Sequence, residues 1–413
     1  MPASAKLAEL DARGAPAARQ PRVDSDAATS VTVDVIAGTR LAEIQMEWRD
    51  LIARADVANI FMHPVLVALS ACYPDSQTRA LLAWQSSGGR RRLAGFWAFA
   101  AGRAPRSIIP LSVLAAPPFA QAYLASPMID RGLLEPTLQA MLDHIAADAS
   151  LPKVIALDAM RDGDATAQAL MRVLASRDSA PAILRRFMRP MLASMLDAKQ
   201  YMEIALSASR RKKLRQHRRR LSEKGALESK IISDPGAVGR ALEDFLRLEA
   251  AGWKGRNRTA LLCNVADATF TREMVAALAA QGEASIHALA LDGCPVSMQI
   301  VLRAGTTAFT WKTTYDEKLH DFSPGMLLFE DYTAAFLADP GIECVDSCCY
   351  DDSSFMASWS ERQPMTEMWF DARRGGSAAF AHLSRLQGIY LRLRAQAKAA
   401  YLAGTWRPRR ETA

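Results

Sequence analysis

The chain has 413 residues, of which 50% are hydrophobic and 23% are charged, a composition typical of globular proteins with ample core. This length suffices for two domains of ordinary size. No apolar run approaches the roughly 18 residues that a membrane helix requires, so we expect no integral membrane segment. Residues 1–30 are rich in Ala, Asp, Arg and Pro without the apolar core of a secretory signal, and we expect a disordered tail there.

Cysteine usage and charge distribution favour a reduced, cytoplasmic protein with one basic block. The six cysteines are scattered along the chain and none forms a CxxC pair, so the sequence predicts no metal site. The formal net charge of +7 is concentrated in Arg210–Lys224, which holds nine Lys or Arg and one Glu. The rest of the chain is therefore close to neutral.

In the first half, alternation and apolar periodicity predict a meander of strands, then a helix and a further strand. The predicted strands are 31–36, 80–85, 92–101, 107–114 and 153–158, and the predicted helices are one capped by Thr39, one over 133–147 and one over 165–175.

The second half repeats this order. Its predicted helices are 237–251, 269–280 and 324–338, and its predicted strands are 285–291, 295–303, 306–313 and 342–346. We interpret the repeat as a structural duplication in an α/β protein. The predicted domains are 31–195 and 196–375, the latter including a basic helix at 208–224, and a basic helix and tail follow at 376–413.

The start of the predicted helix at Ser323-Pro324-Gly325-Met326 is suited to an anion. Ser is a good N-cap and Pro is comfortable at the first helical position. The free N–H groups and positive dipole end of a helix start suit a pyrophosphate, and Gly325 leaves room for a ligand to approach the backbone. The alternative is an ordinary helix N-terminus.

The strand before that helix ends in Thr310-Trp311-Lys312-Thr313-Thr314-Tyr315-Asp316. Strict alternation would place Trp311 and Thr313 on one face and Thr310 and Lys312 on the other. Trp311 could line a pocket, and Lys312 could pair with Asp346 across the sheet or bind an anion. The Tyr315 phenol could protonate a leaving group. The alternative is an amphipathic strand with a core Trp and an exposed Lys.

Two further blocks carry candidate polar groups. Asp346 and Ser347 end a strand, where a carboxylate is well placed to act as a base, although an Asp in an Asx-turn is an equally ordinary reading. In Gly252-Trp253-Lys254-Gly255, Trp253 could cover a substrate and Lys254 could contact an anionic part of it, with Glu249 leading into the loop.

The order and content of these four blocks resemble the CelD-like branch of the GNAT acyltransferase superfamily, over roughly residues 200–372. The resemblance implies two tandem GNAT-like domains with mixed, mostly antiparallel sheets flanked by helices, the second domain being catalytic. It implies acetyl-CoA or another acyl-CoA as co-substrate and no metal. The implied acceptor is a small molecule or is linked to a saccharide.

The resemblance also assigns the residues to roles. The catalytic residues would be Asp346 as the base, Tyr315 as the acid, and Lys312. The acyl-CoA would contact Ser323, Pro324, Gly325, Met326, Thr310 and Trp311. The acceptor would contact Trp253, Lys254, Glu249, Asp316 and Ser347.

The basic block Arg210–Lys224 leaves several functions open. It could serve the phosphates of coenzyme A, bind an anionic membrane surface or bind RNA. RNA binding would fit a Fem-type transferase that uses aminoacyl-tRNA, which shares the tandem architecture. The remaining alternative is a non-catalytic module of polysaccharide assembly.

Overall fold

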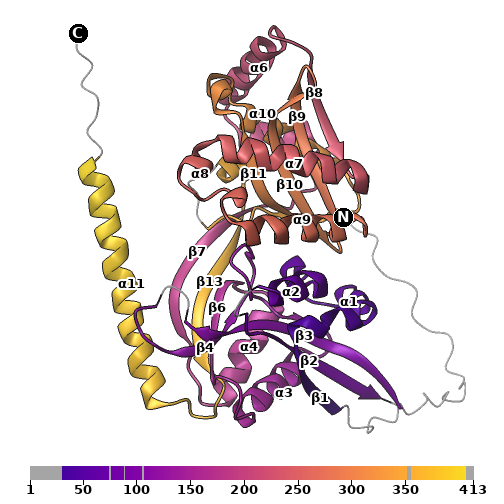
Figure 1. Cartoon of the computed structure of the whole chain (residues 1–413). Coiled ribbons are helices and arrows are strands. Elements are labelled where there is room, and N and C mark those ends of the chain that lie inside the picture. The colour runs from indigo at the N-terminus through magenta and orange to yellow at the C-terminus, as the bar shows by residue number, and fades with distance from the viewer. Residues whose placement is uncertain (1–29, 74–75, 88, 105–106, 351–354, 406–413) are drawn as a thin grey trace, which may run out of the picture.

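The computed structural model describes residues 30–73, 76–87, 89–104, 107–350 and 355–405. Nearly all of the predicted disordered tail therefore lies outside the described residues. Figure 1 shows a lower part built from the first half of the chain and an upper part built from the second half, with the long helix α11 along one side.

The strands and helices of the first half alternate in the predicted order. Its strands are β1 (Ser30–Ala37), β2 (Thr78–Ser87), β3 (Arg90–Arg103), β4 (Ser112–Ala116), β5 (Met128–Ile129), β6 (Val154–Arg161) and β7 (Ala182–Leu192). Its helices are η1 (Gly38–Ile44), α1 (Gln45–Ile52), η2 (Ile60–Met62), α2 (Pro64–Ala71), α3 (Leu134–Ala147) and α4 (Ala165–Ser176).

The second half begins with two helices and then repeats the meander. Its strands are β8 (Leu227–Ile232), β9 (Ala284–Leu291), β10 (Cys294–Ala304), β11 (Thr307–Tyr315), β12 (Cys344–Asp346) and β13 (Glu361–Asp371). Its helices are α5 (Ala198–Ala205), α6 (Ala208–Ser222), α7 (Pro235–Ala251), α8 (Trp253–Arg256), η3 (Leu261–Cys263), α9 (Val265–Ala279), η4 (Glu317–Phe322), α10 (Pro324–Ala338), η5 (Phe355–Ser358) and α11 (Ala378–Thr405).

The described strands join into one continuous sheet rather than two separate ones. Its order is β1-β2-β3-β4-β6-β13-β7-β12-β11-β10-β9-β8, with β5 paired to β3. Each half contains one parallel pair, β4 with β6 and β11 with β12, and the other pairs are antiparallel. The last strand, β13, returns to the first half and lies between β6 and β7. Strand β7 in turn pairs with β12 of the second half.

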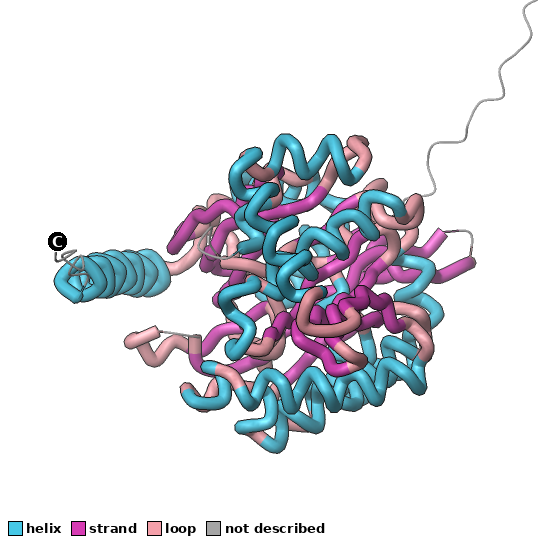
Figure 2. Tube along the Cα trace, turned by 90° about the horizontal axis from the view of Figure 1, so that it is seen from above, coloured by secondary structure: helices cyan, strands magenta, loops and turns pink. Residues whose placement is uncertain are grey.

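Helices cover both faces of this sheet, as the views along two axes show (Figures 1 and 2). In the second half, α7 and α9 pack on one face of β9–β11, and α10 packs on the other with α5 and α6 behind it. The apolar core between β9–β11 and the helices α7 and α9 also includes Phe61 and Leu66 from the first half. The two halves therefore share apolar packing. The indole of Trp311 adds a hydrogen bond to the carbonyl of Gln121 at 2.8 Å.

Several element predictions need correction. Residues 107–111 are not strand, and β4 begins only at Ser112. Thr39 lies within a 3-10 helix whose N-cap is Ala37. Strands β7, β8 and β13 and helix α5 are among the elements that have no counterpart in the predicted order. Among the described residues no helix combines the length and apolarity needed to cross a bilayer.

Because β13 completes the first half of the sheet, the two halves should not fold separately. We expect fragments 30–195 and 196–413, expressed alone, to show no cooperative thermal transition by circular dichroism. Fragment 30–195 would leave β7 without either of its partner strands and would expose the edge of β6 that pairs with β13. Co-expression should restore a cooperative transition close to that of the full chain. A soluble, monomeric fragment 30–195 that melts cooperatively would contradict the conclusion that the first half needs β13 in order to fold.

Candidate active site

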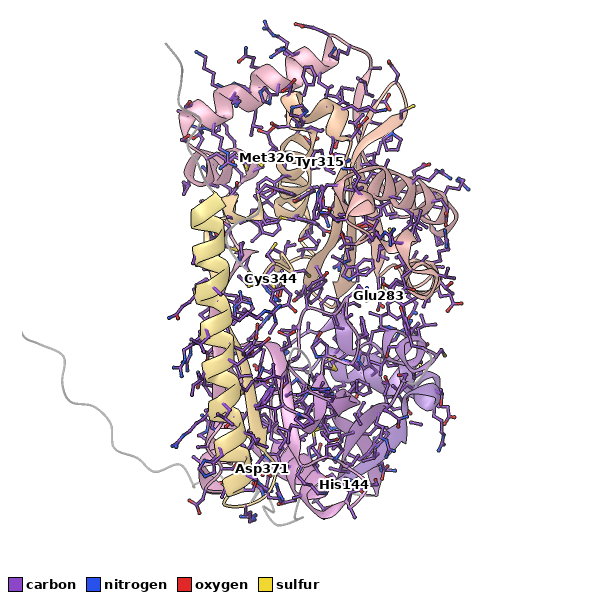
Figure 3. All side chains as sticks on the ribbon, turned by 60° about the vertical axis from the view of Figure 1, so that its left-hand side comes forward. His144, Glu283, Tyr315, Met326, Cys344 and Asp371 are labelled. Atoms are coloured by element: carbon purple, nitrogen blue, oxygen red, sulfur yellow. The ribbon has the colours of Figure 1, made fainter. Side chains whose placement is uncertain are left out.

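The C-terminal end of β11 and the start of α10 lie together. Strand β11 pairs with β12 only over Thr307–Phe309, and its last six residues continue without a β12 partner. A Cβ placed on Gly325 would lie 3.8 Å from the ring of Tyr315, which is an ordinary contact. Figure 3 labels Tyr315 and Met326 at this place. The structure thus brings the predicted acid beside the predicted pyrophosphate site.

The start of α10 differs from the prediction in one respect. Ser323 adopts a left-handed conformation (φ 50°, ψ 53°), and its side chain makes no capping hydrogen bond. It is therefore not the ordinary N-cap that was expected. The Ser323 carbonyl accepts from the N–H groups of Met326 and Leu327 at 2.9 and 3.1 Å. Pro324 is buried, whereas Gly325 is partly exposed.

Basic side chains of α6, and of Lys224 just after it, lie near this helix start. Arg210 Nη2 lies 3.9 Å from the sulfur of Met326, and Arg220 and Lys224 lie 5.4 and 5.3 Å from the ring centroid of Phe322. Burial lowers the pKa of His217, and the neighbouring Lys213 and Arg220 charges lower it further. Basic side chains thus gather at the helix start, as an anion site requires, while Glu330 and Asp331 of α10 pair with Arg218.

A bulge in β11 reverses part of the predicted alternation. Ile300 pairs with Lys312 and Val301 pairs with Thr310, so Trp311 is the extra residue. Trp311 and Lys312 consequently lie on the same side of the strand, and the Lys312 Nζ is 5.5 Å from the Trp311 ring centroid. The prediction that they face opposite ways is wrong. The side chain of Gln299 fixes the bulge by donating to the carbonyl of Lys312 at 2.9 Å.

Lys312 lies at the junction of the two halves of the chain. Its Nζ is 5.7 Å from the ring centroid of Tyr123, which belongs to the first half. Burial lowers the pKa of Lys312, opposed by the negative charge of Glu249. Among the residues that the structure describes, its Nζ makes no hydrogen bond or ion pair, and the predicted pairing with Asp346 is wrong. An amine in this setting is suited to proton transfer.

Asp346 is instead the partner of a buried arginine that the sequence analysis missed. Both carboxylate oxygens lie 3.3 Å from Nη1 of Arg189 on β7, and both side chains have no exposed surface. Oδ1 also accepts from the N–H of Cys348 at 2.8 Å. Arg161 of β6 lies 3.9 Å away. This geometry favours a role in positioning over the predicted role as a base, because the carboxylate is fully buried and both of its oxygens are engaged within the protein.

Thr310 and Trp311, predicted to contact acyl-CoA, are buried against the protein itself. The Thr310 hydroxyl donates to the carbonyl of Asp346 at 3.3 Å. Ser347 is also buried, and its hydroxyl accepts from the N–H of Cys349 at 3.3 Å. In this conformation these three residues shape the strand ends and present no side chain to a ligand.

The loop after α7 is held to β11 by an internal ion pair. The Lys254 Nζ donates to Glu249 at 2.8 Å and to the carbonyl of Thr313 at 2.9 Å. Glu249 is buried and also accepts from the N–H of Leu261 at 2.8 Å. Lys254 and Glu249 therefore support the loop. Trp253, by contrast, is 49% exposed.

Two features keep the Trp253 loop in place. A Cβ on Gly255 would lie 1.8 Å from the carbonyl oxygen of Ala250, so only glycine fits there. Glu317 of η4 accepts from the N–H of Trp253 and from Arg256. The adjacent Asp316 caps η4 by accepting from the N–H of Lys318 at 2.9 Å. Asp316 thus has a local structural role.

Cys348 follows β12 and does not present a reactive thiolate. Cys348 is buried, and burial together with the charge of Asp346 raises its pKa well above the ordinary thiol value. Within the described part of the chain, no group of three or more His, Cys, Asp or Glu is placed to hold a metal ion.

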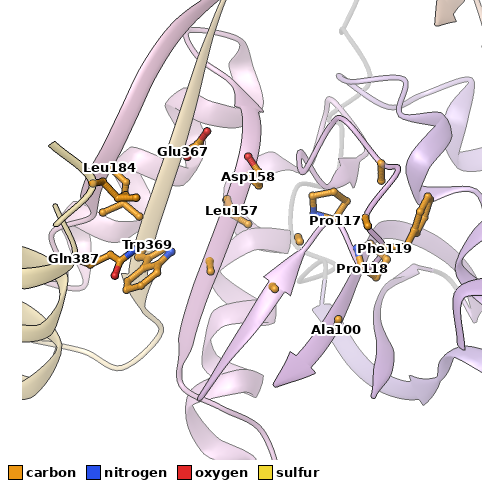
Figure 4. A pocket seen from close by; sticks show the side chains of 16 residues that line it. Ala100, Pro117, Pro118, Phe119, Leu157, Asp158, Leu184, Glu367, Trp369 and Gln387 are labelled. Carbon is orange, nitrogen blue, oxygen red and sulfur yellow. The ribbon is translucent and has the colours of Figure 1, made fainter. Parts of the chain in front are cut away.

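A separate pocket lies in the first half, near the end of β4 and beside α11 (Figure 4). Its volume is about 320 Å³, and its walls are mostly apolar, including Phe119, Leu157 and Trp369. Asp158 and Glu367 add two carboxylates. None of the predicted site residues lines this pocket.

Comparisons with known proteins agree with this arrangement. Residues 208–355, from the start of α6 to η5, match the family of the acetyltransferase (GNAT) domain. The match includes the ends of β11 and β12 and the start of α10. No curated protein shows significant sequence similarity to the chain.

Solved structures extend the likeness to most of the chain. The crystal structure of FemX has a TM-score of 0.57 and 11% identity, covering 82% of this chain and 98% of that one. The C-terminal DUF2156 domain of "Putative Lysylphosphatidylglycerol Synthetase" from Agrobacterium fabrum has a TM-score of 0.51 and 14% identity, covering 85% and 97%. At such identities these matches show the fold alone. The chain thus has a mixed α/β fold with a GNAT-like domain.

Because Asp346 neutralises a buried arginine, we expect the Asp346→Asn variant to lose stability. Removing one partner of a buried ion pair costs about 3 kcal/mol, since the other charge remains buried. Urea unfolding at neutral pH would measure the loss. The control is Asp339→Asn, whose carboxylate lies 3.8 Å from Arg303 in a half-exposed pair and should change stability by less than about 1 kcal/mol. An Asp346→Asn variant of unchanged stability would contradict the structural role that we assign to the ion pair.

Proposed function

We propose that the protein is an acyltransferase that moves an acyl group from acyl-CoA to an amine or hydroxyl acceptor. The observation that carries the proposal is the position of the first turn of α10. This turn contacts the C-terminal end of β11, which does not pair with β12. Basic side chains of α6 lie near the same turn. The GNAT-domain match over residues 208–355 supports the same reaction class.

The donor would lie on the α10 side of β11. The N–H of Gly325, the positive end of the α10 dipole and the charges of Arg210 and Arg220 would hold its phosphates. The thioester would then lie beside Tyr315, whose ring is next to Gly325. When the carbon–sulfur bond breaks, the phenol would give its proton to the departing thiolate.

The acceptor would approach from the opposite side of β11, where Lys312 and Trp253 lie. The exposed Trp253 would cover the acceptor. Neutral Lys312 would take a proton from the acceptor amine or hydroxyl as the new bond to the acyl carbon forms. In this scheme Asp346 holds the strand ends and Lys312 replaces it as the base.

We further propose the CelD-like setting of cell-envelope or exopolysaccharide synthesis for this reaction.

The donor site is tested by calorimetry with acetyl-CoA and longer acyl-CoAs. We expect binding by the native protein and a loss of affinity of at least about tenfold in Gly325→Asp, because the new carboxylate would lie where the pyrophosphate is expected. The matched control is Gly236→Asp, which changes the glycine after the first proline of α7 and should bind normally. Absence of binding by the native protein would refute acyl-CoA as the donor.

The role of Lys312 is tested by the pH dependence of acyl transfer. Burial lowers its pKa, so the neutral amine becomes populated below the ordinary lysine value of about 10.4. We expect kcat/KM to rise with pH through an inflection below that value. Lys312→Arg keeps the charge but cannot release a proton, and it should lower kcat by about 100-fold or more.

A Lys312→Arg variant that keeps its rate and its pH profile would remove Lys312 as the base. Binding of acyl-CoA provides the control, because Lys312 lies on the opposite side of β11 from the proposed donor site. Calorimetry should give the same affinity for the variant as for the native protein. A joint loss of binding and activity would instead indicate a damaged fold.

A second candidate donor is aminoacyl-tRNA, as in the Fem-type alternative. The observation in its favour is that α6 also exposes basic residues, including Lys212, Arg215 and Arg219. RNA binding through them would weaken steeply with salt. Tight, salt-sensitive binding of tRNA together with no binding of acyl-CoA would establish this alternative.

A further inference from the structure

The C-terminal helix α11 uses only part of its surface to pack against the protein. Phe380, Ser384 and Gln387 are buried on β7 and β13, and the Gln387 side chain accepts from Ser107 at 2.9 Å. Residues 392–397 are exposed without exception. Figures 1 and 2 show the helix at one side of the molecule, with its C-terminal part extending along the body.

A second face of the same helix is apolar and exposed. Leu386, Ile389 and Leu393 are 55%, 46% and 60% exposed. At about 100° per residue these three side chains fall within a narrow stripe, on nearly the opposite side of the helix from Phe380 and Gln387. We call these three residues the outer stripe. An exposed apolar stripe on a helix already anchored by its other face requires an explanation.

The charge of the helix indicates what covers the outer stripe. Residues 378–405 contain Arg385, Arg392, Arg394 and Lys398 and no acidic residue. Arg385 and Arg392 are exposed and border the outer stripe on one side. An apolar stripe bordered by arginines, on a helix without acids, complements an anionic lipid surface.

We propose that α11 is an interfacial helix that docks the protein on an anionic membrane through the outer stripe. The apolar side chains would enter the acyl boundary, and the bordering arginines would contact the headgroup phosphates. The helix would lie on the membrane and not cross it.

A second copy of the chain is a poorer occupant of the outer stripe. Three partly exposed side chains fall far short of the roughly 800 Å² per partner that a stable dimer buries. Two copies of α11 would also bring arginines together with no acid on either helix to pair them. An anionic membrane surface needs no large matching patch on the protein, because it is extended. It also pairs the arginines, because it is negatively charged.

The proposal is tested by sedimentation of the full chain with vesicles of equimolar phosphatidylglycerol and phosphatidylcholine. We expect binding to these vesicles and at least tenfold weaker binding to pure phosphatidylcholine. The double variant Ile389→Glu/Leu393→Glu should lower binding by about tenfold or more, and Arg385→Glu/Arg392→Glu should do the same. All four positions are exposed, so thermal transitions should match that of the native protein.

Two controls separate α11 from other surfaces. Arg215→Glu/Arg219→Glu makes the same charge change on α6 and should leave vesicle binding nearly unchanged. Met46→Glu places one charge on another exposed apolar side chain and should also have little effect. Absence of binding to the anionic vesicles would overturn the proposal, as would binding that only the α6 variant lowers. A native dimer that Ile389→Glu/Leu393→Glu dissociates would assign the outer stripe to a second copy.

Discussion

The buried ion pair between Arg189 and Asp346 is the interaction on which the centre of the structure depends. Arg189 comes from β7 and Asp346 from β12, and these strands pair where the two halves of the sheet meet. Arg189 also donates to the carbonyls of Tyr123 at 2.7 Å and Cys349 at 2.9 Å. One guanidinium therefore fixes a loop of the first half and the turn after β12. Such a charge is tolerated in the interior because the Asp346 carboxylate neutralises it and because Nε and Nη1 donate to these partners.

The order of elements could be predicted from the sequence, but the exchange of strands could not. Meander, helix and strand have local signals in both halves, such as the alternation of 285–291 and the helical periodicity of 237–251. Strand β13 contains Pro364 and several charged residues, and β7 contains Arg185, Arg186 and Arg189. Their residue pattern does not look like a buried strand, because their stability comes from pairing with distant strands. The isolated Arg189 among apolar neighbours was the signal that could have revealed the buried pair.

The candidate site was predicted in part for a similar reason. The approach of Tyr315 to Gly325 follows from chain order, since a strand end and the next helix start are close in sequence. The bulge at Trp311 could not be predicted, because a period of two assumes that no residue is inserted. This single extra residue turns Lys312 toward Tyr123 and away from Asp346. The alternation of the sequence therefore identified the residues of β11, but it predicted the wrong neighbour for Lys312.

The bulge has a chemical consequence for the proposed reaction. It leaves Tyr315 on the α10 side of β11 and Lys312 on the side of the first half, so the proposed acid and base flank one strand end from opposite faces. A donor held by its phosphates and an acceptor held by apolar contacts would then meet without competing for the same surface. The electrostatics agree with this division. Basic side chains gather around α10, whereas burial among aromatic rings favours the neutral amine of Lys312.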